Sequence, residues 1–340
     1  MAVVKADAYG HGAVETAKAL VRQGVHRLAV VSIEEGIALR HADIQASILV
    51  LGPLFPEQVA DLLEHRLIPV ISDLSVLPAL ARATAAFVTA YPVHLKIDTG
   101  MGRLGLTQQD FAALMSSNGF PASLHLEGLM THLADTDGAS PETTDRQLKR
   151  FSEAIDTVTA CGLTPLIHAA NSGGAVRFPQ ARFSLIRPGI MLYGYHTLPK
   201  TITAPSLKAV LSLTSRVAQL RTLQTGATAS YNGTFTARRT THLAILPIGY
   251  ADGVNRRLSN RGHVLLHGER APMVGLVCMD MILVDVTGIP GVAVGDEAIL
   301  IGRQGQNEIT ASDIAGWLGT IPYEVLCSIG PRIPRRYQHA

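Results

Sequence analysis

The chain has few charged residues, few cysteines and one tryptophan. Charged residues make up 16% of its 340 residues, and 29 Lys and Arg against 27 Asp and Glu leave a net charge of +2. A net charge this small gives no electrostatic reason to expect a nucleic-acid or acidic membrane partner. At 47% hydrophobic residues, the composition lies far from that of disordered chains. We expect a globular protein with no nucleic-acid and no membrane partner.

The shortage of cysteine bears on compartment and on metals. Cys161, Cys278 and Cys327 cannot all pair internally, and no Cys-x-x-Cys motif occurs. This pattern favours a reducing compartment and argues against a structural zinc, so we expect no metal. Long apolar runs are absent, and the opening residues lack the features of a signal peptide. The simplest location is the cytoplasm.

The first 200 residues alternate short apolar segments with helical patterns. Near-continuous Val, Ile and Leu runs are typical of buried parallel strands, and each parallel connection needs a crossover, usually a helix. Eight such strands predict a (β/α)8 TIM-type barrel. The expected strands are Ala2–Lys5, Arg27–Ser32, Ser47–Gly52, Leu67–Ser72, Val93–Thr99, Glu127–His132, Leu166–Asn171 and Phe183–Arg187. The expected helices include Val14–Gln23, Glu34–Ala42, Pro56–His65 and Pro141–Cys161.

After about residue 200 the pattern changes to short apolar segments joined by Gly- and Pro-bearing turns. This is typical of a mostly β domain. With the boundary near Lys200–Pro205, we predict a barrel over residues 1–203 and a β domain over 204–340. The expected strands are Ser206–Leu223, Thr241–Ile248, His263–Leu266, Met273–Val277, Met281–Val286 and Glu297–Ile301.

The strand count leaves one crossover helix unassigned. Eight strands have seven connections between them, and the chain leaves the last strand for the β domain. A helix over the seam between the last and first strands would have to precede Lys5, where almost no sequence stands. We expect either a further N-terminal segment or a partner or other element at this seam.

Polar residues follow most of the expected barrel strands. Lys5 leaves Ala-Val-Val and enters Ala-Asp-Ala-Tyr-Gly-His-Gly. This is the edge of a parallel barrel where chemistry is done, and a lysine there can form a Schiff base with a carbonyl. Taken alone, such a lysine is more often a strand end that meets solvent. Other such segments are HLKIDTGMGRLG (with Lys96, Asp98 and Arg103), GLMTHLADTD (with His132), IHAANSGG (with His168, Asn171 and Ser172) and SLIRPGIMLYG (with Arg187). In the β domain they are SYNGTF, LPIGYADG, VCMDM and PYEVLCSIGPRIPR.

Taken together, these motifs resemble those of the alanine racemases, pyridoxal 5′-phosphate (PLP) enzymes built from a barrel and a C-terminal β domain. The resemblance runs from residue 2 to about 337, with motifs of both domains in the family's order. It implies racemisation of alanine by two bases, D-alanine supply for peptidoglycan, and a homodimer whose active sites are shared between subunits.

The resemblance assigns the cofactor's contacts. Lys5 would hold PLP covalently, and Arg187 would donate a hydrogen bond to the pyridine nitrogen. Because arginine stays protonated, the ring nitrogen would not take a proton, which favours racemisation over transamination. Arg103 would meet the phenolic oxygen. The remaining contacts, to the phosphate, would come from Tyr9, Asn171, Ser172, Gly189, Ile190 and Tyr323.

The catalytic and substrate roles follow in the same way. Lys5 would serve one face of the substrate and Tyr231 of a second subunit the other, with His132 linking the tyrosine to Arg187. A tyrosine with a pKa near 10 needs a shift of about three pH units, roughly 4 kcal/mol, to be mostly ionised at pH 7. Arg103 and the Met279 backbone would bind the substrate carboxylate, with Asp280 lining the site.

Three further positions match the family less fully. Lys96 stands where some members carry a carbamylated lysine, and both the modified and the free amine stay open. Tyr250 and Arg256 would line the substrate entryway, although ordinary packing explains Arg256 equally well. Leu276 replaces an arginine that many members place near that entryway, which leaves the charge at the gate open.

Three other interpretations compete with the racemase. A PLP-dependent decarboxylase of the same barrel class disagrees with Arg187 and with the PYEV and VCMD motifs. A non-enzymatic PLP-binding homeostasis protein shares a barrel and a similar lysine, but it has no second β domain. A barrel without PLP would leave Lys5, Arg103 and Arg187 without a shared explanation. Whether D-alanine is made for peptidoglycan or degraded stays open.

Overall fold

The computed structural model describes residues 1–116, 120–138 and 140–338. The chain divides into two compact units. The first comprises Met1–Ala8, Gly12–Leu192 and His196–Ser206, and the second comprises Tyr9–His11, Tyr193–Tyr195 and Leu207–Ala340. Within the described ranges no helix is long and apolar enough to cross a bilayer.

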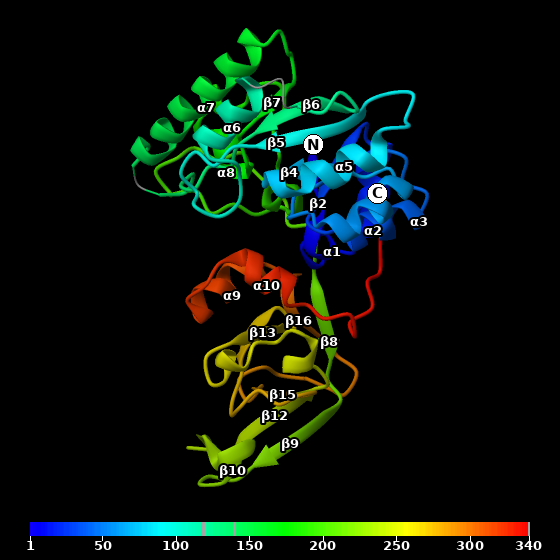
Figure 1. Ribbon diagram of the computed structural model, residues 1–340. Coiled ribbons are helices and arrows are strands. Elements are labelled where there is room, and N and C mark those ends of the chain that lie inside the picture. The colour runs from blue at the N-terminus through cyan, green and yellow to red at the C-terminus, as the bar shows by residue number, and fades with distance from the viewer. Residues whose placement is uncertain (117–119, 139, 339–340) are drawn as a thin grey trace. The chain divides into compact units, whose positions relative to one another are not determined.

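The first unit is built on a parallel sheet whose seven strands pair in sequence order, β1 to β7 (Figure 1). Every strand is rich in Val, Ile and Leu, and most of the strand residues are buried, as expected for a sheet covered on both faces. The strands are β1 (Ala2–Val3), β2 (Arg27–Val30), β3 (Ser47–Val50), β4 (Ile68–Ile71), β5 (Tyr91–Lys96), β6 (Leu124–Met130) and β7 (Leu166–His168).

The prediction of an eighth strand at Phe183–Arg187 was wrong, although this segment lies where such a strand would close the barrel. Ser184 N and Arg187 N donate to carbonyls of Ile167 and Ala170, at 3.0 and 2.9 Å. On its other side, the Pro188 carbonyl accepts from Val3 N of β1 at 3.0 Å. Phe183 has φ +41, which breaks the extended conformation at the start of the segment. The segment thus bonds both edge strands without forming a regular strand.

Helices follow the strands, as the alternating pattern predicts. The four predicted helices are confirmed within a few residues, with one divided into a 3₁₀ turn, η1 (Pro56–Gln58), and α4. In α7, Phe151, Ala154 and Val158 recur at spacings of three and four and form its buried face. The helices are α2 (Ala13–Arg22), α3 (Ile33–His41), α4 (Val59–Glu64), α5 (Leu77–Thr84), α6 (Gln108–Ser116), α7 (Glu142–Ala160) and α8 (Ser172–Arg177).

The second unit is mostly antiparallel β structure followed by two helices (Figure 1). One sheet has the order β15-β12-β9, another β14-β13-β16-β17 with β8 also paired to β16, and β10 pairs with β11. The elements are β8 (Leu213–Arg216), β9 (Gln219–Leu223), β10 (Thr228–Ala229), β11 (Phe235–Thr236), β12 (Thr241–Leu246), β13 (His263–Leu266), β14 (Glu269–Pro272), β15 (Ile282–Asp285), β16 (Glu297–Gln304), β17 (Asn307–Ile309), α9 (Ala311–Leu318) and α10 (Pro322–Cys327).

The predicted strand Met273–Val277 was also wrong. The strand that pairs with β13 lies immediately before it, at β14. After a single bridge at Met273, Gly275 turns the chain with φ +73. An added Cβ at Gly275 would lie 2.5 Å from the Ser230 side chain, so this turn depends on glycine. The segment 274–280 is therefore a loop.

The segment after Lys5 is a left-handed helical turn, α1 (Lys5–Gly10), where the sequence suggested only a polar loop. Ala6, Asp7, Ala8 and Tyr9 have φ between 52 and 55, and the Ala8 amide donates to the Val4 carbonyl at 2.9 Å. L-residues in this conformation are disfavoured by roughly 1–2 kcal/mol each. The surroundings must therefore hold the turn.

Two carboxylates hold the left-handed turn. Glu35 of α3 accepts the Ala6 amide at 2.6 Å through Oε1 and the Val31 amide at 2.7 Å through Oε2. Asp7 Oδ1 accepts the amide of Ala13, the first residue of α2, at 2.7 Å. These bonds join the turn to the ends of β2 and α2, and so they position Lys5 at its start.

We predict that Ala6→Gly does not destabilise the protein. Because Ala6 is exposed and left-handed, glycine removes a steric penalty, and we expect the free energy of unfolding to rise by about 0.5 kcal/mol. The matched control is Ala19→Gly, at an exposed position in the right-handed helix α2, which lowers it by about 1 kcal/mol. Urea unfolding measures both, and a loss of stability in Ala6→Gly equal to that in Ala19→Gly would contradict the left-handed turn.

Candidate active site

Four cationic side chains of the first unit influence one another at the carboxyl ends of its strands. Lys5 follows β1, and Lys96 is the last residue of β5. Burial lowers the pKa of Lys96 to about 8, and the charges of Arg103, Arg187 and Lys5 contribute to this shift, while Asp98 opposes it. The structure thus brings together four residues that the motifs singled out separately.

Arg187 is the buried centre of this group, with only 3% of its surface exposed. Its Nη2 donates to the carbonyls of Thr131 and Ala169, at 2.8 and 3.0 Å, and its Nη1 lies 2.8 Å from His168 Nδ1. Burial lowers the pKa of Arg187 to about 10, which still leaves it a cation at neutral pH. Because its acceptors are carbonyls and imidazoles, the positive charge is held without being neutralised.

His132 lies beside Arg187, with its Nδ1 3.4 Å from Arg187 Nη2. Burial, followed by the charges of Arg187 and Lys96, lowers the pKa of His132 to about 3. The ring is therefore neutral at physiological pH. With Nδ1 facing an arginine donor, its proton stands on Nε2.

Arg103 stands on a glycine-rich loop that folds back on β5. The Asp98 carboxylate accepts the amides of Gly100, Met101 and Gly102 at 2.9–3.2 Å. Gly105 closes the loop at φ +136, where an added Cβ would lie 2.6 Å from the Asp98 amide nitrogen. Asp98 is therefore engaged in building the loop.

The predicted phosphate segments of the first unit meet at Ser172. Its buried Oγ accepts the amides of Gly189 and Met191, at 2.9 and 3.4 Å. Asn171 caps α8 by accepting the Gly174 amide at 2.8 Å. Ile190 follows Gly189 and begins the 3₁₀ turn η4 (Ile190–Tyr193). The two turns that the sequence placed after β7 and after Arg187 are thus directly bonded.

Three tyrosines cluster in the second unit. The Tyr9 ring centroid lies 5.0 Å from that of Tyr193 and 5.9 Å from that of Tyr323 on α10. Burial raises the pKa of Tyr9 far above its usual value, with Tyr323 and Cys327 adding to the shift. Tyr9 and Tyr323 lie together, as a shared contact requires, and the Tyr9 hydroxyl keeps its proton at neutral pH.

Tyr231, Tyr250 and Met279 are connected to one loop, residues 276–280. Ser230, next to Tyr231, donates its hydroxyl to the Leu276 carbonyl at 2.8 Å. Tyr250 N donates to the Cys278 carbonyl at 2.9 Å, and the following amide donates to the Met279 carbonyl. Tyr231 is 68% exposed and Met279 52% exposed. Met279 in this segment, which we call the 276–280 loop, and Tyr231, next to the Ser230 that bonds the loop, are thus large exposed side chains.

The other predicted residues of the second unit, Asp280 and Arg256, also lie near this loop. Asp280 ends the 276–280 loop and accepts a hydrogen bond from Arg332 Nη2 at 2.8 Å, while Arg332 Nε lies 3.2 Å from Asp252 Oδ1. Arg256 begins the 3₁₀ turn η7 (Arg256–Leu258). Ser259, which follows this turn, accepts the Val277 amide at 2.9 Å and so joins the turn to the loop.

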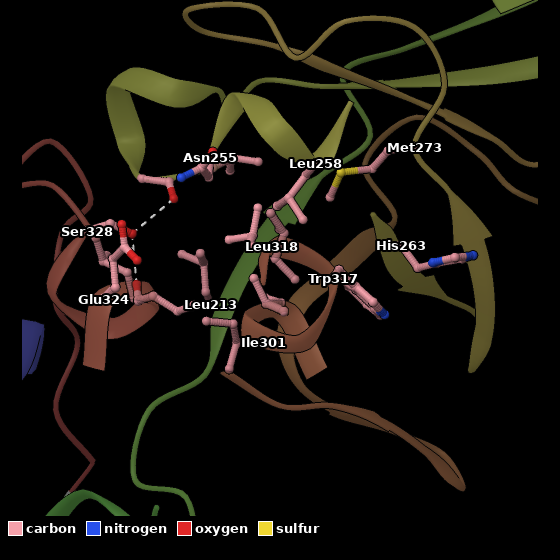
Figure 2. Close-up of a pocket in the computed structure, with 16 residues that line it drawn as sticks. Leu213, Asn255, Leu258, His263, Met273, Ile301, Trp317, Leu318, Glu324 and Ser328 are labelled. Atoms are coloured by element: carbon pink, nitrogen blue, oxygen red, sulfur yellow. Dashed lines mark hydrogen bonds between the residues drawn. The ribbon is translucent and has the colours of Figure 1, made fainter. Parts of the chain in front are cut away.

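A cavity of about 60 Å³ also lies in the second unit, between α9, α10 and β13 (Figure 2). Its walls are mainly apolar, including Leu258, Met273 and Leu318, with Trp317 and His263 side by side. Ligand pockets usually measure about 300–1,000 Å³. The cavity is too small for a cofactor, and none of the predicted site residues lines it.

Sequence reasoning assigned no role to three residues that the structure places in contact with the site. His168 was noted at a strand end, but its contact with Arg187 depends on tertiary folding. His94 reaches His168 from β5, and no pattern signals this. Tyr193, fully buried, contacts Tyr9 and His11 in the tyrosine cluster. Only its closeness to Arg187 along the chain could have drawn attention to Tyr193.

Comparison with known proteins is consistent over both units. The family model "Alanine racemase, N-terminal domain" matches residues 1–197, and "Alanine racemase, C-terminal domain" matches residues 210–337. The alanine racemase of Halothermothrix orenii is 41% identical over 340 residues, covering 100% of this chain and 90% of that protein. That of Symbiobacterium thermophilum is 43% identical over 338 residues, covering 99% and 90%.

Solved structures show the same similarity. The alanine racemase from E. faecalis superposes with a TM-score of 0.92 at 33% identity, covering 99% of this chain and 91% of that one. The alanine racemase from Bartonella henselae, solved with covalently bound pyridoxal phosphate, gives 0.90 at 32% identity, covering 99% and 92%.

We predict that His132 contributes to acid destabilisation. In the unfolded chain the His132 imidazole takes up a proton below about pH 6.5, whereas in the folded chain it stays neutral down to about pH 3. The free energy of unfolding therefore falls as the pH falls through this window. In His132→Asn, the decrease in unfolding free energy between pH 7.5 and pH 5 should be smaller by about 2 kcal/mol. Urea unfolding at the two pH values measures it. His125→Asn, at an exposed position of β6, is the control and should keep the wild-type decrease.

Proposed function

This chain belongs to the alanine racemase family and is a pyridoxal-phosphate-dependent racemase of alanine, and we propose that Lys5 and Tyr231 exchange the α-proton on opposite faces of the substrate. The observation that supports this best is the convergence of Lys5, Lys96, Arg103 and Arg187 on one edge of the barrel. Two of them suit the cofactor's ring: Lys5 would hold it covalently, and Arg187 would donate to its pyridine nitrogen.

The charges present fit the cofactor. Four cations lie there, and three of them lower the pKa of Lys96. Asp98 raises that pKa, but its carboxylate is bonded to the amides of its own loop. Such an excess of positive charge suits a phosphate, a phenolic oxygen and a substrate carboxylate. When bound, pyridoxal phosphate withdraws electrons from the substrate's α-carbon and so acidifies the proton on it.

Arg187 influences where the proton from the substrate's α-carbon goes. Its guanidinium stays charged, so toward the cofactor's ring nitrogen it donates a hydrogen bond and gives up no proton. Arg187 would thereby keep the ring nitrogen unprotonated, which would make the ring a weaker acceptor of electrons than a protonated one. Return of the proton to the α-carbon is favoured over transfer elsewhere, which suits racemisation.

The two bases have different surroundings. Lys5 stands at the start of the left-handed turn, and its charge acts on Lys96. Tyr231 is 68% exposed in its own chain, which agrees with use by a second subunit in a homodimer with shared sites. His132, neutral and with Nδ1 toward Arg187, offers Nε2–H to the tyrosinate and stabilises it.

The remaining roles complete the site. Arg103, the Met279 backbone and Asp280 would hold or border the substrate carboxylate, and Lys96 would support Arg103. The lowered pKa of Lys96 leaves more of its amine neutral, which is the form that carbon dioxide modifies. Tyr250 and Arg256 would line the entryway. The phosphate would lie at Tyr9, Asn171, Ser172, Gly189, Ile190 and Tyr323, on the bonded turns and the tyrosine cluster.

We place the activity in the cytoplasm, where D-alanine would supply peptidoglycan synthesis. The three cysteines are free thiols, which suits a reducing compartment. A catabolic role would use the same chemistry in the opposite direction. Growth of a strain lacking this gene with and without D-alanine separates them, since only a biosynthetic role makes the strain depend on added D-alanine.

We predict that the purified chain with pyridoxal phosphate converts L-alanine to D-alanine, and that Lys5→Ala lowers turnover by a factor of at least about 10³. Lysine supplies both the covalent attachment and one base, so nothing replaces it. A coupled D-amino-acid oxidase assay measures the product. Lys18→Ala, at a half-exposed lysine on α2, is the control and keeps wild-type turnover. No turnover by the wild-type protein, despite a borohydride-sensitive absorbance from bound cofactor, would contradict the substrate.

The shared site makes a separate prediction. Lys5→Ala and Tyr231→Phe subunits are each impaired alone, but a mixed dimer has one site that retains both bases. Mixing, with exchange of subunits verified by mass spectrometry, should restore up to about a quarter of wild-type activity, since half the dimers are mixed and each has one intact site. Absence of recovery in verified mixed dimers would contradict sites built from two subunits.

A further inference from the structure

Two buried histidines that the proposed mechanism does not use form a line from Arg187 into the barrel. His168 Nδ1 lies 2.8 Å from Arg187 Nη1, and its Nε2 lies 2.8 Å from His94 Nδ1. His94 Nε2 in turn faces Glu127 Oε2 at 3.5 Å. Both histidines are fully buried. We call Arg187, His168, His94 and Glu127 the barrel relay.

The backbone is shaped to allow the relay. His94 stands on β5 and His168 on β7, so the two rings must meet across β6. Gly128 of β6 makes this possible, because an added Cβ there would lie 2.1 Å from His94 Nδ1. The register between β5 and β6 also shifts at Val93/His94, so that Glu127 falls opposite this irregularity. Bulges of this kind re-aim side chains.

The far end of the relay is an ion pair. Glu127 Oε1 accepts from Arg27 Nη1 of β2 at 2.7 Å, which leaves Oε2 for His94. His94 and Arg27 together lower the pKa of Glu127 to about 2, so it is a carboxylate at every working pH. Burial lowers the pKa of both histidines, which keeps both rings neutral. Among the described residues, neither His94 Nε2 nor Glu127 Oε2 has a hydrogen-bond partner, and the two atoms face each other at 3.5 Å.

These facts allow one arrangement of protons. Arginine only donates and a carboxylate only accepts, and each neutral imidazole has one N–H and one lone pair. Arg187 therefore donates to His168 Nδ1, His168 Nε2–H donates to His94 Nδ1, and the remaining N–H, on His94 Nε2, points toward Glu127 Oε2. Reversing either ring alone places two donors against each other at one contact of the relay and two acceptors against each other at the neighbouring contact.

We propose that Glu127 and His94 are positioning residues for the racemase reaction, which fix the tautomer of His168 so that it accepts from Arg187. This rests on the proposed function, in which Arg187 faces the cofactor's ring nitrogen. His168 in the other tautomer would point an N–H at Arg187 and displace the guanidinium. Glu127 is separated from Arg187 by two imidazole rings. It thus determines which nitrogen of His168 carries the proton, and so whether His168 can accept from Arg187.

The test reads the tautomers directly. Nitrogen-15 NMR of histidine-labelled holoenzyme, assigned with His94→Asn and His168→Asn, should show both rings neutral and protonated on Nε2 between pH 6 and pH 9. A wild-type His168 that is protonated on Nδ1, or that is an imidazolium, would overturn the proposal whatever the variants do.

A double-variant cycle separates the relay from a structural ion pair. In Glu127→Gln, Arg27 draws the new amide's oxygen, so its NH2 group faces His94 and both rings reverse; kcat should fall about tenfold. Arg27→Gln breaks the same ion pair but leaves the Glu127 carboxylate for His94, so tautomers and kcat should stay within about twofold of wild type. In the double variant the amide oxygen at position 127 is free to turn to His94, and wild-type tautomers and most of kcat should return.

A purely structural ion pair gives a different pattern. Both single variants would then be equally impaired, the double variant would match them, and the tautomers would not change, which would overturn the proposal. If Glu127→Gln does not fold, the wild-type tautomers and those of Arg27→Gln still decide. If wild-type protein has the expected tautomers but does not racemise alanine, the proposed function fails, while the proton arrangement of the relay stands.

Discussion

The buried Arg187 guanidinium is the constraint on which the rest of the barrel site depends. Removing a cation from water is disfavoured by several kcal/mol unless other groups hold it. Here two carbonyls and two histidines accept from Arg187, and no described carboxylate forms an ion pair with it. The charge therefore remains available to a ligand, and it lowers the pKa of Lys96 and of His132. One buried cation thus influences the protonation of its neighbours.

The backbone near the site is held in conformations that most sequences avoid. The left-handed turn after Lys5 contains four consecutive non-glycine residues at positive φ. Glu35 accepts the Ala6 amide of this turn, and Asp7, within the turn, accepts the Ala13 amide of α2. Such strain persists only where the surroundings over-determine it, and it gathers at functional sites. Around Arg187 the segment 183–188 stays irregular, so its backbone bonds both edge strands while its arginine is directed inward. In both places an irregular backbone positions one side chain, Lys5 in the first and Arg187 in the second.

Sequence reasoning was most successful where a pattern reflects local physics. The strands β1 to β7 were visible because buried parallel strands need continuous apolar runs, and the helices because burying one face requires a 3.6-residue period. The eighth strand and the strand at 273–277 were predicted from composition alone. Phe183 and Gly275, both at positive φ, interrupt them, and neither conformation is encoded in hydrophobicity. The alanines after Lys5 likewise give no sign of a left-handed turn.

By itself the sequence determined the order of elements, the two-part organisation and the residue types at each strand end, because these depend on neighbours along the chain. It also singled out Lys5, Arg103, Arg187 and Tyr231 as candidate site residues through their motifs. Tertiary structure alone decided which of them act on one another. The line from Arg187 through His168 and His94 to Glu127 joins three strands and a loop, and it exists only because Gly128 leaves room across β6. Protonation depends on burial and on such distant contacts, so only the folded chain sets it.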